Sequence, residues 1–511
     1  MKGGEPSILT QAAQIDQQPE QPSFEPNAPA NAPRTTPWTL FILSFVSIIP
    51  FWTARYPFLD DYPNHLARWF VLFHIKDGAY HFANMYAPAW GPLPYITPDI
   101  LAMVLQYLLP IDVVGRCILS LCIILIPVAT YFFLKKACPR NVGLASFGIL
   151  VAFNPMFLMG SISNEFSLAF GLMVVGLWVS YCKTAKVITA VGIAIGLILV
   201  YLSHLSGFLV AGLVMGIYAL FQAQRWKKVG TLALLSLPAL LIFVYNPSHA
   251  GTGASFRYGE HPVWSKLKGL TFPFRLDTSK GLDLIFLAGL VILVFLVLKK
   301  RPKFALQRVW LVVCGTLLLL YFAAPGQYGF GGYVDTRFLL FMYLFLLAVI
   351  RFDQLPRYLH VSLALLVLFR VATVEQMFIS HQHELKQLTA SFEAIPRNAK
   401  VLPLVRFPNN LVGAGDIHHL EYGVIQRGFL DPELFHLQGV DPIRLVGSPY
   451  CPNVFCDVAN APEVDWQQVA SSYDYLWVYR DPEITKFTSR IGDAVFSNDS
   501  VTVYQVPRPH L

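Results

Sequence analysis

The chain has 511 residues, of which 55% are hydrophobic and only 14% are charged. Soluble proteins carry about 25% charged residues, so this composition excludes an ordinary soluble enzyme. The net charge of +7 lies in short basic clusters between apolar blocks. Membrane topology accounts for such clusters, so the charge indicates no nucleic-acid partner.

The apolar blocks are long enough to cross a bilayer, which takes about 20 residues of helix. Residues 1–36 precede the first block and are rich in Pro, Gln, Asn and Ala, which predicts a disordered cytoplasmic tail. The fold class that we expect is a polytopic α-helical membrane protein whose bundle occupies residues 37–375. Eleven spans are predicted, at 37–54, 113–134, 142–159, 166–182, 186–203, 205–223, 229–246, 283–298, 307–324, 335–351 and 357–374.

Five short connections between these spans are basic. Together they hold fifteen Lys or Arg and a single acid, Asp353. Basic loops stay in the cytoplasm, so these connections predict a multi-pass inner-membrane protein of a bacterium with a cytoplasmic N-terminus. Eleven spans then place the C-terminal part in the periplasm. The five connections are 135–140, 183–186, 225–228, 299–308 and 351–357.

The first outer loop, 54–112, carries the most informative segment, ARYPFLDDYPNHLARWF. We expect an amphipathic helix at 62–76 and a short surface helix at 98–109. If the first helix begins at Pro63, then Asp61, His65 and Arg68 share one face. Together with Asp60 they could take a proton from a hydroxyl and hold an anion, because adjacent acids raise each other's pKa. The alternative is a helix cap with a surface network.

Polar residues also occur at the outer ends of later predicted spans. Asn164 and Glu165 lie between spans three and four, and His204 lies between spans five and six. Asp335 and Arg337 open span ten. Ionisable groups at this depth are costly and are candidates for function, although they can also cap helices, and the last two can pair with each other. All lie on the face of the first outer loop, which favours one outward-facing site.

Residues 376–511 have the composition of a small periplasmic α/β domain. The segments at 399–405, 473–480 and 500–506 predict strands, and those at 383–395 and 482–491 predict helices. Cys451 and Cys456 are the close cysteine pair of this part, and they form a disulfide if the compartment is oxidising.

In the last predicted span, the buried Arg370 requires an anionic or carbonyl partner, which could be a lipid phosphate.

This organisation resembles the GT-C superfamily of membrane glycosyltransferases. One span is followed by a long outer loop whose start carries acids, here Asp60 and Asp61. The loop continues to a short helix, PDILAMVLQYLLP, and the next span opens with an Arg in VVGRCILS. The third predicted span ends in FNPMFLMGSISNE, and a soluble domain closes the chain. The resemblance covers the layout of residues 37–375.

The resemblance implies transfer of a sugar from a polyprenyl-phosphate carrier to an acceptor on the outer face. The matching acid, Asp61 or Asp60, acts as general base or metal ligand, and Glu165 stands where some members carry a second acid. His204 and Arg337 are the candidates for the lipid phosphate. The acids here are Asp-Asp, whereas protein mannosyltransferases commonly have Asp-Glu, so a divalent metal ion and the acceptor type stay open.

We therefore expect an inverting glycosyltransferase. The acceptor is a glycan, lipid or protein of the cell envelope, and membrane lipid surrounds the bundle. His65, Arg68 and Asp335 complete the predicted substrate-binding set, with the first two orienting the base or the donor. One alternative is a transporter or flippase of lipid-linked glycan, but internal repeats and polar groups at mid-membrane are not evident. The other is a non-catalytic assembly protein.

Overall fold

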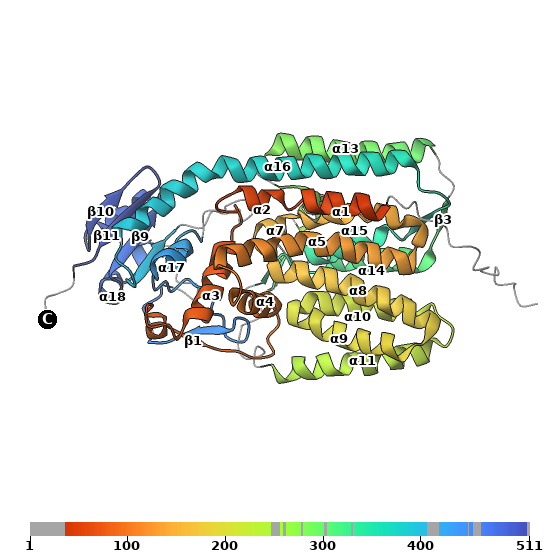
Figure 1. Cartoon of the computed structure of the whole chain (residues 1–511), viewed down its shortest axis with the longest axis horizontal. Helices are drawn as coiled ribbons and strands as arrows, with labels where there is room; N and C mark the ends of the chain where they lie inside the picture. The colour runs from red at the N-terminus through yellow and green to blue at the C-terminus, as the bar shows by residue number, and fades with distance from the viewer. Residues whose placement is uncertain are drawn as a thin grey trace, which may run out of the picture.

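Long helices run side by side, and a small sheet domain lies at one end of them (Figure 1). The computed structural model describes residues 36–246, 256–258, 262–276, 279–300, 304–328, 331–405, 418–447, 449–452 and 461–507. The bundle helices are α1 Thr36–Val46, α2 Ile49–Thr53, α5 Ile111–Ala137, α6 Phe147–Ala152, α7 Pro155–Leu158, α8 Ile162–Thr184, α9 Val187–Ser203, α10 Leu205–Leu220, α11 Arg225–Tyr245, α13 Lys280–Lys300, α14 Arg308–Ala323, α15 Thr336–Leu346 and α16 Arg357–Ala390.

Five of these helices are long and apolar enough to cross a membrane: α5, α8, α11, α13 and α16. Shorter apolar helices match five further predicted spans, at Pro37–Thr53, Val187–Ser203, Leu205–Leu220, Arg308–Ala323 and Thr336–Leu346. These elements confirm a polytopic helical fold with a small C-terminal sheet region. The apolar blocks alone predict the positions of these helices.

The structure differs from the prediction at 142–159, where no continuous span forms. A 3₁₀ helix, Pro139–Leu144, is followed by the short helices α6 and α7. Helix α6 ends at Ala152, and Asn154 begins α7 as its N-cap, because its Oδ1 accepts hydrogen bonds from Met156 N at 2.8 Å and Phe157 N at 3.2 Å. Pro155 follows it, and a residue before proline disfavours helical geometry. The chain therefore turns here and presents residues 159–163 to the first outer loop.

The described residues of the five basic connections lie at the end of the bundle away from the sheet domain, where Figure 1 labels β3. Strand β3, Phe304–Leu306, pairs with β6, Ile350–Phe352. Arg140 forms an ion pair with Asp353 at 3.2 Å. Lys183 Nζ donates to the carbonyl of Lys136, and Lys228 lies over the ring of Tyr181. This gathering agrees with a single basic face, and its cytoplasmic location stays a prediction.

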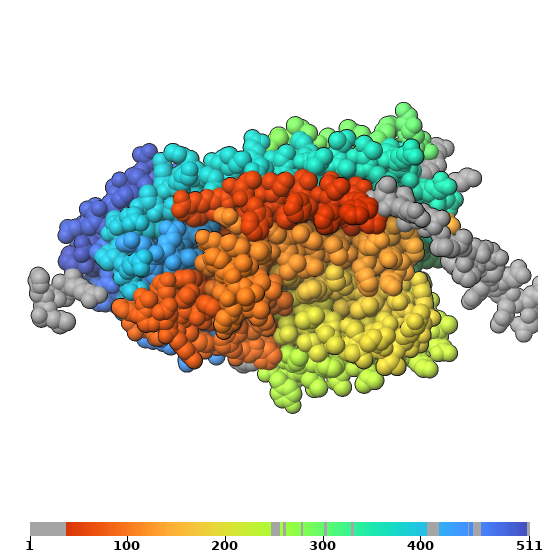
Figure 2. All heavy atoms as spheres, viewed as in Figure 1, coloured from red at the N-terminus to blue at the C-terminus, as the bar shows by residue number. Residues whose placement is uncertain are grey.

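The first outer loop forms α3, Tyr62–His74, β1, Tyr86–Pro88, and α4, Thr97–Gln106. Both predicted helices are confirmed with shorter bounds. Helix α3 is almost entirely buried, although the amphipathic helix that the sequence predicts would leave its polar face exposed. The reason is that its polar residues Asn64 and Arg68 find partners inside the protein. In Figure 2 this orange segment meets the blue C-terminal segment at one end of the molecule.

Helix α16 passes the predicted domain boundary at 375–376 without a break and carries the C-terminal domain. That domain contains a four-stranded sheet of order β10-β11-β9-β7, in which β7 and β9 are parallel. Leu402, Leu476 and Ile484 are among the residues of its own buried core. The elements are β7 Val401–Leu404, α17 Glu421–Arg427, β8 Ile443–Leu445, α18 Trp466–Ser472, β9 Tyr475–Tyr479, α19 Pro482–Thr488, β10 Asp493–Ser497 and β11 Val501–Gln505.

The C-terminal domain and the first outer loop are joined by backbone pairing. Strand β1 pairs antiparallel with β8, and α17 packs on α3. The hydroxyl of Tyr86 donates to the carbonyl of Asp431 at 2.7 Å and accepts from its N–H. Segments more than 300 residues apart in the sequence therefore lie in direct contact. The remaining described α-helix is α12 Pro262–Gly269, and the remaining described strands are β2 Phe256–Arg257, β4 Gln327–Tyr328 and β5 Gly331–Gly332.

Candidate active site

The adjacent acids Asp60 and Asp61 of the first outer loop are held against the turn after α7. Asp60 N donates to Leu158 O at 3.1 Å, and Asp61 N donates to Met159 O at 3.0 Å. Gly160 has φ of +87°, and a Cβ there would lie 2.8 Å from Asp61 Cβ and 3.0 Å from Asp61 N. Only glycine permits this approach, so the turn fixes the position of Asp61.

Asp61 lies at the N-cap of α3, yet its side chain makes no cap hydrogen bond. One third of the side chain is exposed, and Oδ1 lies 3.6 Å from Nε2 of His418. Burial raises the pKa of Asp61 to about 6, against the opposing charge of His418 and with the help of Glu421. The geometry therefore does not support the alternative in which Asp61 only caps the helix. A carboxyl with this pKa can accept a proton near neutral pH.

His418 and Glu421 come from the C-terminal domain and were missed by the sequence prediction. His418 Nδ1 lies 2.8 Å from Glu421 Oε1, which also accepts from Asn64 Nδ2 at 2.8 Å. Burial lowers the pKa of His418, but the charge and hydrogen bond of Glu421 and the charge of Asp61 raise it to about 9. His418 is therefore a cation at neutral pH, placed between two carboxylates.

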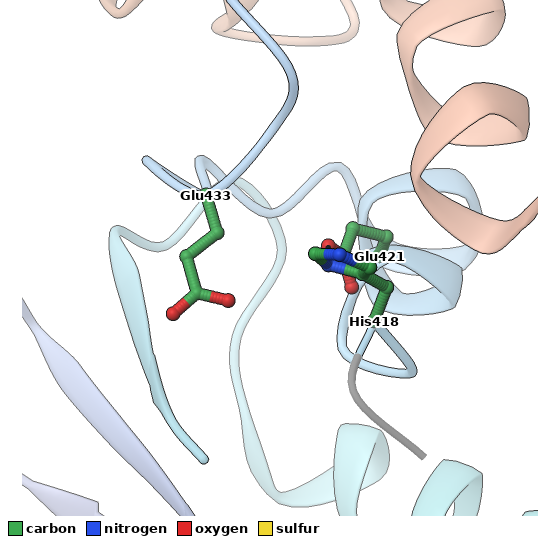
Figure 3. Close-up of side chains that lie close together, drawn as sticks. All are labelled: His418, Glu421 and Glu433. Atoms are coloured by element: carbon green, nitrogen blue, oxygen red, sulfur yellow. Dashed lines mark hydrogen bonds and ion pairs between the residues drawn. The ribbon is translucent and has the colours of Figure 1, made fainter. Parts of the chain in front are cut away.

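Three residues of this region could hold a metal ion. Ligand atoms of His418, Glu421 and Glu433 all lie within 4.8 Å of one another, and the three side chains are buried (Figure 3). Glu433 belongs to a separate stretch of the same C-terminal segment. The group does not include Asp60, Asp61 or Glu165, which are the metal ligands that the resemblance suggests.

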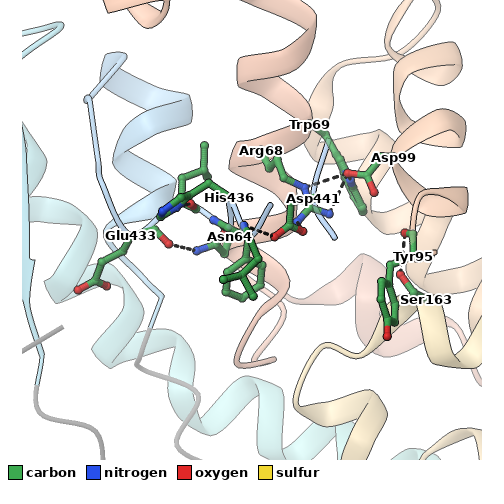
Figure 4. A network of polar contacts seen from close by, with 12 residues as sticks. Asn64, Arg68, Trp69, Tyr95, Asp99, Ser163, Glu433, His436 and Asp441 are labelled. Atoms are coloured by element: carbon green, nitrogen blue, oxygen red, sulfur yellow. Dashed lines mark hydrogen bonds and ion pairs between the residues drawn. The ribbon is translucent and has the colours of Figure 1, made fainter. Parts of the chain in front are cut away.

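Arg68 shares the α3 face with Asp61 but points to other partners. Its Nη2 lies 2.8 Å from Asp99 on α4, and its Nη1 lies 2.7 Å from Asp441. Trp69 also donates to Asp99, at 3.1 Å (Figure 4). Arg68 therefore clamps α3, α4 and the C-terminal domain together, and both of its carboxylate partners are buried.

His65 is partly buried and lies against two aromatic rings. Its ring stacks on Trp69 with centroids 6.1 Å apart and meets the edge of Phe435 at 5.4 Å. Among the described residues its Nδ1 has no hydrogen-bond partner. Burial and the positive charges of Arg68 and His418 hold the pKa of His65 well below its usual value. His65 is therefore neutral and cannot itself neutralise an anionic donor.

Glu165 lies in the first turn of α8 and is only 1% exposed. Asn154 Nδ2 donates to its Oε1 at 3.0 Å, and Asn164 Nδ2 lies 3.5 Å away. The other oxygen, Oε2, has no hydrogen-bond partner among the residues that the structure describes. Asn154, which lies at the break in the predicted span 142–159, thus positions this carboxylate. Glu165 N donates to Ser161 O, within the turn that holds Asp61.

A second group of predicted site residues gathers around Tyr95. The ring of Tyr95 meets that of His204 edge-on at 4.4 Å, and the charge of Arg337 acts on both. His204 Nδ1 accepts from Ser206 N at 3.1 Å, so His204 also caps α10. Tyr95 has φ of +79°, a strained backbone conformation that is frequent at functional sites.

Arg337 and Asp335 do not form an ion pair with each other. Asp335 pairs with the buried Lys266 at 2.5 Å and caps α15 through Thr336 N at 2.8 Å. Arg337 Nη2 donates to the carbonyl of Gly332 at 3.3 Å. Among the described residues, Arg337 has no carboxylate within ion-pair distance, and its Nε has no hydrogen-bond partner. Its charge is therefore available to an anionic ligand.

The acid group and the Tyr95 group share one neighbour, the turn 159–163. Asp61 is bonded to Met159 of this turn, and Ser163 Oγ donates to Tyr95 O at 3.0 Å. Figure 4 shows Tyr95 and Ser163 beside the network of Arg68. The structure thus connects the first outer loop with the ends of later helices through this turn, and a single outward-facing site stays a prediction.

Two other predictions concern residues outside this site. Arg370 donates to the carbonyl of Phe274, lies 3.9 Å from Asp283 and stacks over Phe286, which confirms that it needs a carbonyl or anionic partner. Cys451 is disulfide-bonded. The predicted partner, Cys456, lies outside the described residues, so that pairing stays a prediction.

The sequence does contain a signal for the missed residues. His418 and Glu421 stand three positions apart in HHLEY, so they share one face of any helical turn. Composition marks the segment only as part of a soluble domain. Its distance of more than 350 residues from Asn64 gives no hint that the two meet.

No protein-family model and no curated protein sequence matches this chain. Among solved structures, the chain is similar to ArnT from Cupriavidus metallidurans bound to undecaprenyl phosphate, with a TM-score of 0.51 and 11% identity over 92% of this chain and 97% of that one. The apo structure of the same protein gives a TM-score of 0.50 and 11% identity, covering 92% and 98%. The chain therefore has the GT-C fold, and the resemblance is confirmed at the level of fold.

Proposed function

We propose that this protein is an inverting membrane glycosyltransferase that moves a sugar from a polyprenyl-phosphate donor to a hydroxyl of a cell-envelope acceptor. The carrying observation is Asp61, a partly exposed carboxyl with a raised pKa that is not used as a helix cap. The GT-C fold supports the proposal, as does the undecaprenyl phosphate bound to ArnT, a ligand of the class that we propose here.

The chemistry requires a base on the acceptor side. The Asp61 carboxylate takes the proton of the acceptor hydroxyl, and the acceptor oxygen bonds to the anomeric carbon of the donor sugar. The bond from that carbon to the phosphate oxygen breaks, and polyprenyl phosphate leaves with the electron pair. The His418 cation beside Asp61 keeps the carboxyl ionised until it receives the proton.

The leaving phosphate requires cations or hydrogen-bond donors. Arg337 lies near the turn 159–163 and has no carboxylate partner among the residues that the structure describes. Tyr95 and His204 lie beside it. Fixed donors at a developing negative charge lower the barrier, because they need no rearrangement during reaction. We assign the donor phosphate to this group.

The proposal places the site on the outer face of a bacterial inner membrane. The basic connections lie together at the opposite end of the bundle, and basic loops remain cytoplasmic. The sheet domain, which lies at the site end, then faces the periplasm and contributes to acceptor binding. The donor reaches Arg337 from within the membrane.

The test compares envelope glycans by mass spectrometry in a deletion strain carrying wild type, Asp61→Asn or Asp77→Asn. Asp77 lies in the same loop, but its side chain is 45% exposed, pairs with His74 at 3.3 Å and accepts from Ala79 N at 3.0 Å. General-base catalysis contributes roughly 100- to 10,000-fold, so Asp61→Asn should lose the product while Asp77→Asn retains it.

Immunoblotting establishes that the three proteins reach equal levels. Unchanged glycans in the Asp61→Asn strain at equal expression would contradict the enzyme proposal and favour an assembly protein. Lipid-linked donor that accumulates on the cytoplasmic side of deletion cells would favour a flippase.

A further inference from the structure

We propose that His418, Glu421 and Glu433 form a binding site for a divalent transition-metal ion of the Mn²⁺ or Zn²⁺ class. All three side chains belong to the C-terminal domain, and His418 lies next to Asp61. It goes beyond the proposed transfer reaction, because the three side chains would hold the ion whether or not a sugar is transferred.

The geometry brings one imidazole and two carboxylates into a small volume. Their ligand atoms lie within 4.8 Å of one another, and His418 Nδ1 is 2.8 Å from Glu421 Oε1. The exposed fractions of the three residues are 7%, 1% and 6%. Ligand atoms around one metal ion at about 2.0–2.2 Å are separated by distances of this order. Small side-chain movements suffice to close the set.

Asn64 of α3 positions both glutamates. Its Nδ2 donates to Glu421 Oε1 at 2.8 Å and to the backbone carbonyl of Glu433 at 3.0 Å. Its Oδ1 accepts from Phe435 N at 2.8 Å. Asn64 therefore fixes the spacing of two chain stretches that carry ligands, in the way that outer-shell residues support metal sites.

Asp431 gives an independent indication that this region binds a cation. It is fully buried, and its Oδ2 has no hydrogen-bond partner among the described residues. The carboxyl lies within electrostatic range of Glu421 and His418. One imidazole thus faces the carboxyls of Glu421, Asp61 and Asp431. Buried carboxylates are costly unless a cation compensates them, and a divalent ion compensates them better than a single proton.

The ligand types select the class of ion. An imidazole nitrogen with two carboxylates suits Mn²⁺ or Zn²⁺. Ca²⁺ and Mg²⁺ prefer ligand sets made only of oxygen.

His418 connects this site with the proposed base. Binding of the ion at Nδ1 displaces the proton of that nitrogen, so the ion then supplies the positive charge that His418 carries without metal, while Nε2 keeps its proton and faces Asp61 Oδ1 at 3.6 Å. Metal-bound histidines commonly donate their second N–H to a carboxylate. The ion would therefore fix the tautomer and orientation of His418 beside Asp61.

The test uses full-length protein in detergent, treated with a chelator and dialysed against Mn²⁺ alone or Zn²⁺ alone. Bound metal is counted by elemental analysis, and Mn²⁺ binding is followed by loss of the free-ion signal in electron paramagnetic resonance. We expect one ion per chain. Glu433→Gln and His418→Gln should weaken binding at least about tenfold. Glu393→Gln, whose side chain is 79% exposed in the same domain, should bind as wild type.

Gel filtration and the midpoint of thermal unfolding show whether each variant is folded. If His418→Gln does not fold, the result for Glu433→Gln, the variant closest in shape to the wild type, decides the test. Wild type that binds neither ion saturably overturns the proposal. So does equal binding by Glu433→Gln and Glu393→Gln, which would locate the ion elsewhere. The assay needs no donor or acceptor, so its failure leaves the transferase proposal standing, and an inactive transferase leaves the metal site standing.

Discussion

Replacing Asp441 by Asn should loosen the C-terminal domain from α3. Arg68 Nη1 lies 2.7 Å from Asp441 Oδ1, and only 3% and 10% of the two side chains are exposed. The variant keeps the shape and loses the charge, while Asp99 still pairs with Arg68. Hydrogen bonds to charged groups contribute about 1.5–3 kcal/mol, so we expect a loss of about 2 kcal/mol. That loss corresponds to a roughly 30-fold increase in local opening.

Amide hydrogen exchange of the purified protein measures this opening directly. Ala89 N donates to Pro442 O at 2.7 Å, and Val446 N donates to Met85 O at 2.8 Å, on either side of the β1–β8 pair. In Asp441→Asn these amides should exchange about 30-fold faster, while those of the bundle helices keep their rates.

A matched variant separates the effect of burial from that of charge. Asp353 also pairs with an arginine, Arg140, but the side chains are 53% and 36% exposed. Exposed pairs contribute about 0.2–1 kcal/mol, so Asp353→Asn should change exchange in the adjacent β3–β6 pair only about twofold. Equal and small effects in the two variants would refute the reasoning that the buried clamp of Arg68 holds the domains together.

The other predictions concern the acid itself. The rate of transfer should fall about tenfold per pH unit below about pH 6. The reason is that burial raises the pKa of Asp61 to about 6 and only the ionised carboxylate accepts a proton. A rate in membrane vesicles that is constant down to about pH 5 would contradict this. Gly160→Ala should lower transfer roughly 100-fold, because its Cβ displaces Asp61 and small displacements of reacting groups are costly. Gly212→Ala, where nothing lies within 4 Å, is the control, and full activity of both variants in the glycan assay would count against the packing argument.

The helical layout could be predicted because its signals are local. Apolar blocks, basic connections and alternating strand residues each report on about 20 neighbouring residues or fewer. The strands at β7, β9 and β11 and the helix at α19 therefore lie where the sequence places them. The broken span at 142–159 was missed, because apolar content outweighed the Asn154–Pro155 signal.

The candidate site could be predicted only in part, since half of it forms only where the C-terminal domain packs on the first outer loop. Asp61 and its neighbours are contiguous, and their one-sided placement among outer turns was visible in the sequence. His418 and Glu421 reach Asp61 only because α17 packs on α3. The partner of Asp335 is likewise distant, at Lys266, which no local pattern connects with it.

Because α16 is unbroken, its length determines where the domain that carries His418 lies relative to the bundle. Its 34 residues extend about 51 Å and join the bundle to the domain that carries His418. Inserting a single residue would turn that domain by about 100° and shift it by about 1.5 Å. Surface loops of this protein can tolerate changes of length during evolution, whereas α16 has to keep its residue count for the two halves of the site to stay in register.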